Sequence, residues 1–447
     1  MTRRAVVLGL GDTGFSCVGH LLSRGYDVVV CDSRPTPPLS SRLRESYPAV
    51  EIVTGPFSRD LLTSADLLAV SPGVSVKEPA IAAAAACGVP IVGDIELFAW
   101  ACETPIVAIT GSNGKSTVTT LVGHMLSAAG FRVEVAGNIG VPVLTLLGRA
   151  PPDVYVLELS SFQLETTVSL NAQAATVLNV SPDHMDRYED IADYAYAKAR
   201  IFTGVGRVVV NREDPWVTAM AREDREVVSF GLNRPRAHDF GIVEHEGANW
   251  LVQGRHRLMP TADVPIPGSH NIANVLSAFA LATALCCEFD PMIEAVRGFT
   301  GLAHRTQVLG RYGDVAWIDD SKGTNVGATA AALAGLPGPV VLIAGGEGKG
   351  ADFSPLAAIA ETKARAVVLI GKDAPRIRAV LEGRCPLVEA GSMEEAVVAA
   401  RALARPGDQV LLSPACASFD MFRNYAHRGD VFAEAVRRLV SGTEGSP

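Results

Sequence analysis

The sequence has few aromatic residues and no excess of basic charge. Aromatic side chains make up 6% of its 447 residues, charged side chains make up 19%, and the formal net charge is −9. A chain with this charge has no overall positive field with which to hold nucleic acid or an anionic membrane surface. Anionic substrates must therefore bind at local positive sites.

The sequence also lacks a cysteine framework and long apolar runs. Its eight cysteines form no CxxC pair, which argues against a zinc site or a set of disulfides and favours a reducing cytoplasm. We expect the adjacent Cys286 and Cys287 to be buried apolar filler. No stretch reaches the ~20 apolar residues that a membrane-spanning helix needs.

What the sequence does contain is a folded α/β pattern. Hydrophobic residues make up 48% of a chain that is longer than the roughly 250–300 residues of a single core. Short β-branched runs alternate with helical segments, which predicts mainly parallel sheets covered by helices. We predict three domains: a Rossmann-like domain over 1–94, a central P-loop ATPase-like domain over 95–299 and a second Rossmann-like domain over 300–447.

A glycine-rich turn follows the first predicted strand. Gly9–Gly14 (GLGDTG) lies between a strand and a helix, and Asp32 closes the next strand. The glycines allow backbone N–H groups to approach a diphosphate at a helix N-terminus, and the acidic residue would bind a ribose hydroxyl. Taken alone, this dinucleotide fingerprint would predict a nicotinamide-dependent dehydrogenase.

A second phosphate-binding loop follows at Thr110–Thr117 (TGSNGKST). Its glycines permit a tight turn around the β- and γ-phosphates of a nucleotide, Lys115 supplies a cation, and Ser116 or Thr117 can ligate Mg²⁺. The usual pattern has a further glycine at the position of Ile109, so this loop is a variant of the motif.

Further polar residues follow predicted strands or stand in loops. Glu158 follows Asp153–Leu157, which we interpret as a strand buried on both faces, and a role in holding magnesium is natural there. His184 stands beside a turn. Taken singly, each is more often an ordinary surface residue. The other polar clusters are His270–Asn274, His304–Arg305, Asp319–Asn325 and Gly345–Lys349.

Together these segments resemble the Mur ligase family over nearly the whole chain, and the variant phosphate loop is that family's form of the motif. Within the family the resemblance is to the branch that adds D-glutamate. The segments that carry it are Gly137–Gly140 (GNIG), Glu158–Leu164 (ELSSFQL), Asp320–Asn325 (DSKGTN), Leu412–Asp420 (LSPACASFD), Asn424–Tyr425 and Arg428–Asp430.

The resemblance implies a cytoplasmic, monomeric, ATP-dependent ligase of peptidoglycan precursor synthesis. It would join D-glutamate to UDP-N-acetylmuramoyl-L-alanine through an acyl phosphate. The alternative within this class is another Mur-type or polyglutamate-type amino-acid ligase. A dehydrogenase is disfavoured by the second nucleotide site, and a regulatory module without chemistry is disfavoured by Glu158, His184 and Lys322.

The resemblance also implies two nucleotide sites. The first domain would hold UDP rather than NAD, and the UDP-linked acceptor would contact Gly11, Thr13, Asp32, Ser33, Arg34, Ser71 and Asn138. His184 would also face the acceptor. ATP would contact Gly111, Ser112, Asn113, Gly114, Lys115, Ser116, Thr117, Asn271, Arg305 and Asp320.

The remaining implied roles concern D-glutamate and two magnesium ions. D-glutamate would contact Lys322, Thr324, Lys349, Ser418 and Tyr425. Ser116 and Glu158 would hold the first magnesium, and His184 and Lys198 the second, with Lys115, His184 and Lys198 as the catalytic residues.

Lys198 and Ala303 need separate comment. Lys198 lies in a predicted helical segment over 188–202, where a lysine is by default a solvated surface group. The resemblance implies instead that CO₂ carbamylates it and that the carbamate helps to hold the second magnesium. Ala303 stands where related enzymes usually have proline, and we expect the turn at His304–Arg305 to form without it.

Overall fold

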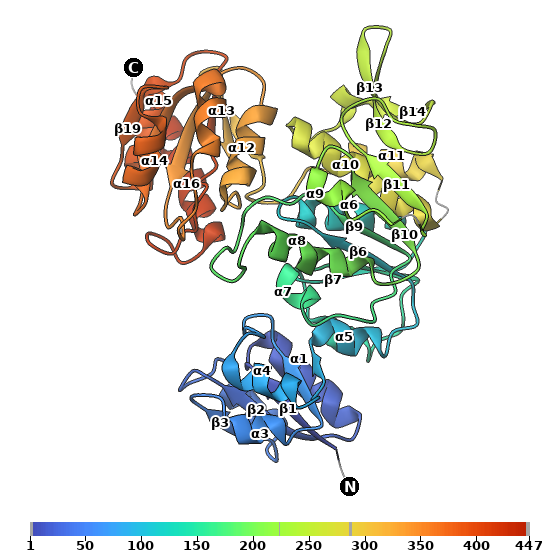
Figure 1. Cartoon of the computed structure of the whole chain (residues 1–447). Coiled ribbons are helices and arrows are strands. Elements are labelled where there is room, and N and C mark those ends of the chain that lie inside the picture. Colours follow the sequence, from blue (N-terminus) through green and yellow to red (C-terminus); the bar gives the residue numbers. More distant parts are fainter. Residues whose placement is uncertain (1–2, 223, 286–287, 444–447) are drawn as a thin grey trace.

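A computed structural model describes residues 3–222, 224–285 and 288–443. It contains three separate sheets in chain order, and Figure 1 shows them as three bodies, blue, green to yellow, and orange to red. The predicted three-domain α/β class is confirmed. We propose 1–94, 95–299 and 300–447 as the domain boundaries, since each range holds one sheet.

The first sheet is entirely parallel, with the order β3-β2-β1-β4-β5. Its strands are β1 (Arg4–Leu8), β2 (Asp27–Asp32), β3 (Glu51–Thr54), β4 (Leu67–Val70) and β5 (Ile91–Val92). Its helices are α1 (Asp12–Ser23), α2 (Ser40–Ser46), α3 (Arg59–Thr63) and α4 (Pro79–Ala86). Because β1 lies between β2 and β4, the loops after these three strands meet at one edge of the sheet.

The central sheet has nine strands in the order β14-β13-β12-β11-β10-β9-β6-β8-β7. The parallel part contains β6 (Ile106–Thr110), β7 (Val133–Gly137), β8 (Val154–Glu158), β9 (Ala174–Val177), β10 (Arg207–Asn211) and β11 (Val227–Phe230). Its helices are α5 (Asp94–Ala99), α6 (Lys115–Ala128), α7 (Ser161–Leu164), α8 (Ile191–Ala199), α9 (Pro215–Thr218), α10 (Ser269–Ala282) and α11 (Phe289–Arg297).

An antiparallel extension at the edge of this sheet was not predicted from the sequence. It consists of β12 (Phe240–His245), β13 (Ala248–Gln253) and β14 (His256–Pro260), which projects from the body in Figure 1. Strand β12 pairs in parallel with β11 at Phe230 and Phe240, so the extension continues the sheet beyond β11, on the side away from β6.

The third sheet has the order β15-β16-β20-β17-β18-β19. Its strands are β15 (Gln307–Tyr312), β16 (Val315–Asp319), β17 (Val340–Gly345), β18 (Ala364–Ile370), β19 (Leu387–Glu389) and β20 (Gln409–Leu412). Its helices are α12 (Val326–Gly335), α13 (Pro355–Lys363), α14 (Ala374–Leu381), α15 (Met393–Leu403) and α16 (Tyr425–Thr443). The parallel strands were predicted, whereas the antiparallel edge strand β15 was not.

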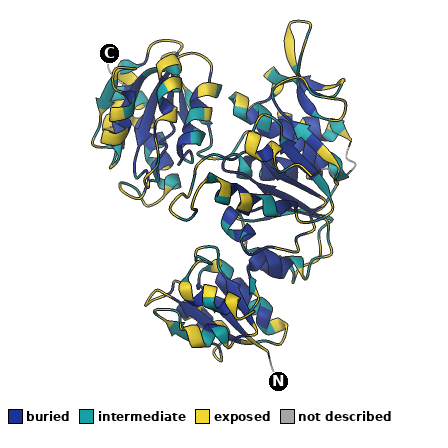
Figure 2. Ribbon diagram, viewed as in Figure 1, coloured by how far each residue is buried: buried dark blue, intermediate teal, exposed yellow. Residues whose placement is uncertain are grey.

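The inner strands of the three sheets are buried, whereas edge strands such as β3, β15 and β19 are partly exposed, and the helices expose mainly their outer faces (Figure 2). The central strands are nearly all apolar because helices cover both faces of each sheet. The six cysteines among the described residues are free thiols, and Cys286 and Cys287 lie outside those residues. None of the described helices combines the length and apolar character that crossing a bilayer requires.

Helix α5 carries a buried carboxyl group next to the first sheet. Asp94 is 1% exposed; its Oδ2 accepts a hydrogen bond from Gln163 Nε2 at 3.2 Å, and its Oδ1 has no hydrogen-bond partner. Burial raises the pKa of Asp94 from 3.8 to about 6. Ionising this group in the folded protein is therefore unfavourable.

We expect Asp94→Asn to change how stability depends on pH. Because the folded-state pKa is raised, the wild type is most stable below pH 3.8 with respect to this group and loses that stability as the pH rises through about 6. The loss amounts to about 3 kcal/mol, and the isosteric amide does not suffer it. In urea unfolding at a series of pH values from 4 to about 7, the free energy of unfolding of the variant should therefore rise relative to that of the wild type. Parallel curves for the two proteins would contradict this expectation.

Candidate active site

The predicted UDP-binding residues gather at the carboxyl edge of the first sheet. Asp32 is buried and ion-paired with Arg34, whose Nη2 donates to Asp32 Oδ2 at 2.6 Å. The Leu10 N–H also donates to Asp32 Oδ2, at 2.8 Å, and these hydrogen bonds lower the pKa of Asp32 to about 2. Ser71 Oγ donates to the carbonyl of Gly9 at 3.1 Å.

The start of α1 supports this edge. A Cβ at Gly14 would lie 1.9 Å from the Gly9 carbonyl oxygen, so only glycine allows the helix to approach the turn so closely. Gly11 is the N-cap of α1 and Thr13 lies in the first turn of that helix, both partly buried, and Ser33 is exposed beside Arg34. The structure therefore brings together the predicted residues of the first domain, while Asn138 belongs to the central domain.

The phosphate loop connects β6 to α6 at the middle of the central sheet. Gly114 precedes α6 with φ +84°, and a Cβ there would lie 2.6 Å from Asn274 Oδ1, which explains the glycine. Lys115 Nζ donates to the carbonyls of Gly111 at 2.8 Å and Ser112 at 2.9 Å. Burial lowers the pKa of Lys115. Lys115 is thus a partly buried side chain rather than an exposed loop cation.

Glu158 ends β8 beside this loop and is 2% exposed. Its Oε2 accepts from Ser116 Oγ at 2.5 Å, and its Oε1 accepts from Asn138 Nδ2 at 2.8 Å. Arg305 Nη2, from the third domain, donates to the same Ser116 Oγ at 2.7 Å. A buried carboxylate next to a hydroxyl is a donor set of hard oxygen atoms, which suits Mg²⁺.

Lys198 is not the surface lysine that its helical segment suggests by default. It is 1% exposed, its Nζ donates to the Gly111 carbonyl at 2.9 Å, and it lies 4.3 Å from the centroid of the Tyr194 ring. Burial, followed by the positive charge of Lys115, lowers the pKa of Lys198 well below its usual value. The default view is wrong because α8 packs this side chain against the underside of the phosphate loop.

His184 lies in the loop before α8, with φ +58° and a half-exposed side chain. Its ring meets the Phe162 ring edge-on, with centroids 4.8 Å apart, and its Nε2 is 3.8 Å from Asp183 Oδ2. Partial burial lowers the pKa of His184. In the described residues no group of three or more His, Cys, Asp or Glu side chains forms a metal site by itself.

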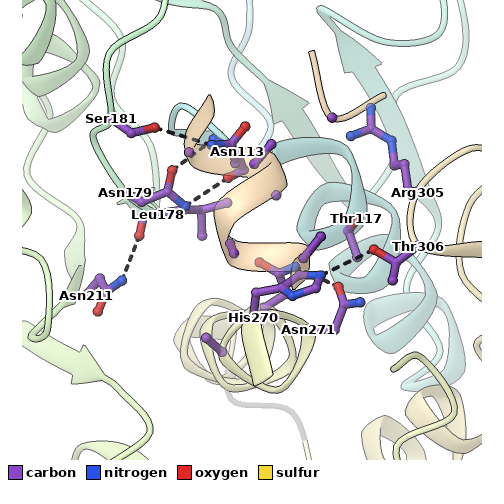
Figure 3. Close-up of a pocket in the computed structure, with 18 of the residues that line it drawn as sticks. Asn113, Thr117, Leu178, Asn179, Ser181, Asn211, His270, Asn271, Arg305 and Thr306 are labelled. Atoms are coloured by element: carbon purple, nitrogen blue, oxygen red, sulfur yellow. Dashed lines mark hydrogen bonds between the residues drawn. The ribbon is translucent and has the colours of Figure 1, made fainter. Parts of the chain in front are cut away.

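A cavity of about 370 Å³ lies between the central and third domains (Figure 3). Figure 3 shows Asn113 with Asn179 and Ser181 on one side of it and His270, Asn271 and Thr306 on the other. The predicted ATP-binding residues that line the cavity are Asn113, Gly114, Thr117, Asn271, Arg305 and Asp320. The others, Gly111, Ser112, Lys115 and Ser116, stand in the adjoining phosphate loop.

Asp320 contributes a buried carboxyl group to this cavity. Its Oδ1 accepts from the Thr306 N–H at 3.0 Å and its Oδ2 accepts from Ser413 Oγ at 2.7 Å. Burial raises the pKa of Asp320 to about 7. The turn before Arg305 forms although Ala303 stands there in place of a proline. The Arg305 N–H closes this turn by donating to the Leu302 carbonyl at 3.3 Å.

The predicted D-glutamate residues follow three strands of the third sheet. Lys322 Nζ lies 4.0 Å from the centroid of the Tyr425 ring, and burial lowers the pKa of Lys322 to about 8. Backbone hydrogen bonds between Glu347 and Ala417 bring the loop of Lys349 next to that of Ser418. Lys322 alone of the five lines the cavity of Figure 3, while Thr324 lies two residues further along the same loop.

Asn325 ends the quoted segment Asp320–Asn325 and Asp183 precedes His184, but neither received a role from the sequence. Asn325 Nδ2 donates to Asn113 Oδ1 at 3.0 Å and to Asp183 Oδ2 at 3.1 Å. Its Oδ1 accepts from Asn113 Nδ2 at 3.3 Å and, as the N-cap of α12, from the Ala328 N–H at 2.8 Å. The sequence signal at Asn325 was its position as a helix N-cap. That position does not reveal that the side chain also binds Asn113 and Asp183 in the central domain.

Comparison with known proteins gives matches in all three domains. Residues 3–93 match the Mur ligase MurD-like N-terminal domain, residues 109–282 the Mur ligase middle domain and residues 304–416 the Mur ligase glutamate ligase domain.

Two curated relatives illustrate the similarity over the full chain, and both are named UDP-N-acetylmuramoylalanine--D-glutamate ligase. The protein of Methylobacillus flagellatus is 54% identical over 441 residues, which cover 98% of this chain and 97% of the relative. The protein of Pseudomonas aeruginosa is 51% identical over 439 residues, which cover 97% and 98%.

Solved structures share the fold at low sequence identity. MurF from Acinetobacter baumannii aligns with a TM-score of 0.61 and 17% identity, covering 98% of this chain and 91% of that one. MurC from Thermotoga maritima aligns with a TM-score of 0.58 and 19% identity, covering 98% and 99%. With the three domain matches and relatives of about half identical sequence over nearly the whole length, the chain belongs to the Mur ligase family.

Proposed function

We propose that this protein is an ATP-dependent ligase that joins D-glutamate to UDP-N-acetylmuramoyl-L-alanine, releasing ADP and phosphate, in peptidoglycan precursor synthesis. The observation that carries the proposal is the full-length similarity to ligases of that name. The arrangement of the candidate sites supports the proposal, because each of the three sheets carries one of them after its strands. These are the glycine loop Gly9–Gly14 in the first domain, the phosphate loop Thr110–Thr117 in the central domain, and the loops of Lys322 and Lys349 in the third domain.

A carboxylate does not react with an amine at neutral pH, because its oxygen is a poor leaving group. In the proposed reaction the acceptor carboxylate attacks the γ-phosphorus of ATP, a P–O bond to ADP breaks, and an acyl phosphate forms. The amine of D-glutamate then attacks the acyl carbon, the C–O bond to phosphate breaks, and the nitrogen loses a proton. Positioning and charge neutralisation supply most of the catalysis in such transfers.

The phosphate loop would hold the nucleotide. Lys115 would place its charge at the γ-phosphate, while Asn113 to Thr117 and the cavity residues Asn271, Arg305 and Asp320 would hold the rest of ATP. Ser116 and Glu158 would hold one Mg²⁺, which would supply positive charge near the phosphate oxygens. Arg305 Nη2 donates to Ser116 Oγ, which supports a contribution of the third domain to this site.

The second magnesium is proposed to depend on a carbamate at Lys198. An ammonium group repels Mg²⁺, whereas a carbamate offers the oxygen ligand that Mg²⁺ prefers. Burial lowers the pKa of Lys198, which favours the neutral, nucleophilic form of its amine. Its nitrogen would attack CO₂, forming an N–C bond and releasing a proton to water. His184 would complete this site and face the acceptor.

The substrates would bind on either side of that centre. D-glutamate would contact Lys322, Thr324, Lys349, Ser418 and Tyr425, which offer cations and hydroxyls to its two carboxylates. The UDP-linked acceptor would contact Gly11, Thr13, Asp32, Ser33, Arg34 and Ser71 in the first domain and Asn138 in the central domain.

A single chain supplies every proposed contact, which supports a monomeric enzyme. The free thiols among the described residues support a reducing compartment, and we propose the cytoplasm.

We expect the enzyme to use D-glutamate and to reject L-glutamate by roughly a hundredfold in kcat/KM. Lys322, Lys349 and Ser418 would fix both carboxylates, so only one enantiomer directs its amine toward the acyl phosphate. The measurement is coupled ADP release with UDP-N-acetylmuramoyl-L-alanine and each amino acid in turn. Equal rates with both enantiomers would refute the proposed pocket. Faster ADP release with another amino acid than with D-glutamate would favour another Mur-type or polyglutamate-type ligase.

A further inference from the structure

Arg187 connects the central domain to the first domain. It follows His184 in the loop before α8, and its backbone N–H donates to the His184 carbonyl at 2.9 Å. Its guanidinium reaches the first domain, where Nη1 donates to the Pro72 carbonyl at 2.8 Å and Nη2 donates to the Val74 carbonyl at 3.3 Å. The side chain is only 13% exposed, so these bonds are largely shielded from water.

The central domain fixes the orientation of this guanidinium. Nη2 also donates to Glu165 Oε2 at 2.6 Å, and the group lies 4.1 Å from the centroid of the Phe162 ring. The ring of His184 meets the same Phe162 ring edge-on at 4.8 Å. Phe162, which lies in α7, therefore contacts both the guanidinium of Arg187 and the imidazole of His184. Glu165, which binds the guanidinium, is the C-cap residue of the same helix.

The two carbonyls that Arg187 binds belong to the turn that supports the glycine loop of the first domain. The Val74 N–H donates to the Ser71 carbonyl at 2.9 Å, which closes the turn. Ser71 Oγ in turn donates to the Gly9 carbonyl at 3.1 Å. A displacement of this turn would therefore move the loop proposed to hold UDP.

We infer that Arg187 is a positioning residue for the UDP-linked acceptor. It fixes the distance between the Ser71–Val74 turn, near the nucleotide end of that substrate, and the His184 loop, near the carboxylate that is phosphorylated. This inference rests on the proposed function. The planar fork of arginine is suited to the task, because two nitrogen atoms of one rigid group reach two carbonyls and a carboxylate together.

A matched control spans the same two domains. Lys77, in the first domain, pairs with Glu189 at 3.4 Å and Asp193 at 3.1 Å, but its side chain is 53% exposed. Such an exposed pair contributes little to holding two bodies in one orientation. The comparison therefore separates a buried, directional contact from a solvated ion pair at the same junction.

The test compares Arg187→Lys and Lys77→Ala with the wild-type enzyme. Lysine keeps the charge but cannot bind both carbonyls and Glu165 at once, so we expect the KM for UDP-N-acetylmuramoyl-L-alanine to rise roughly tenfold. The KM values for ATP and D-glutamate should change by less than about twofold, as should all three values for Lys77→Ala. Thermal unfolding of each variant checks that the fold is retained.

The outcomes that overturn the inference are specific. An unchanged acceptor KM in folded Arg187→Lys, an equal rise in the KM for ATP, or the same rise in Lys77→Ala would each do so. If Arg187→Lys does not fold, Glu165→Gln replaces it, since this variant removes the charge that orients the guanidinium and should raise the acceptor KM selectively, though by less.

Binding of UDP alone, measured by calorimetry, keeps the inference separate from the proposed reaction. A wild-type enzyme without D-glutamate-dependent ADP release would refute the proposed function whatever the variants do. A wild type that ligates, together with an Arg187→Lys variant that binds both UDP and the full acceptor as tightly as the wild type, would refute the positioning role alone.

Discussion

Replacing Lys115 by alanine is expected to reduce D-glutamate-dependent ADP release by roughly a thousandfold. Lys115 begins α6 at the phosphate loop, and its Nζ is held by the carbonyls of Gly111 and Ser112. Its charge would neutralise the γ-phosphate as that group moves to the acceptor carboxylate, and no other lysine stands in the loop. The measurement is steady-state ADP release with saturating ATP and acceptor.

The matched control is Lys363→Ala. Lys363 ends α13 in the third domain, and its Nζ donates to the Leu336 carbonyl at 3.0 Å, so it also loses a lysine-to-carbonyl bond. Both variants should lose about 1–3 kcal/mol of stability at most, and only Lys115→Ala should lose activity. A folded Lys115→Ala enzyme with wild-type turnover would show that the loop cation has no role in phosphoryl transfer.

Lys198→Ala is expected to be nearly inactive, with a loss that is again on the order of a thousandfold. The substitution removes the only group at that position that CO₂ could convert into an oxygen ligand. Acetate should restore part of the activity, because it can place a carboxylate in the space that the side chain leaves. The measurement is ADP release by the variant at increasing acetate, with sodium chloride at equal ionic strength as the control.

Removal of CO₂ tests the same chemistry in the wild-type protein. Depleting dissolved CO₂ and bicarbonate should lower wild-type activity reversibly and leave the acetate-dependent activity of Lys198→Ala unchanged. Because burial lowers the pKa of Lys198 and so favours the neutral amine, we expect carbamate formation near neutral pH. Full activity of Lys198→Ala, or intact mass spectra without CO₂ adducts under CO₂-replete conditions, would refute the carbamate.

Much of the fold was predictable because its signals are local. The buried parallel strands, such as β1 and β6, are continuous apolar runs, and the turns after them need glycine at fixed positions. The antiparallel strands β12 to β14 of the central sheet and the edge strand β15 of the third sheet gave no such signal. They are half-exposed and antiparallel, and their stability comes from pairing with distant segments rather than from their own composition.

The candidate site was predictable in its residue types and only partly in its geometry. The phosphate loop and Glu158 follow adjacent strands β6 and β8, so their meeting at one edge follows from the order of the sheet. The burial of Lys198 has no local cause, since α8 must pack against a loop that lies far from it in sequence. The reach of Arg305 to Ser116 likewise depends on how two domains meet.

The sequence by itself determined the α/β class, the two phosphate-binding loops and the membership of the family, because short motifs and hydrophobic periodicity act over a few residues. Only the tertiary structure decided that Lys198 is buried beneath the phosphate loop, that Asn325 bonds Asn113, and that Arg187 binds the carbonyls of the first domain. Burial and hydrogen bonding between distant segments set the charge state and the orientation of such groups, and neither property is encoded in the neighbouring residues.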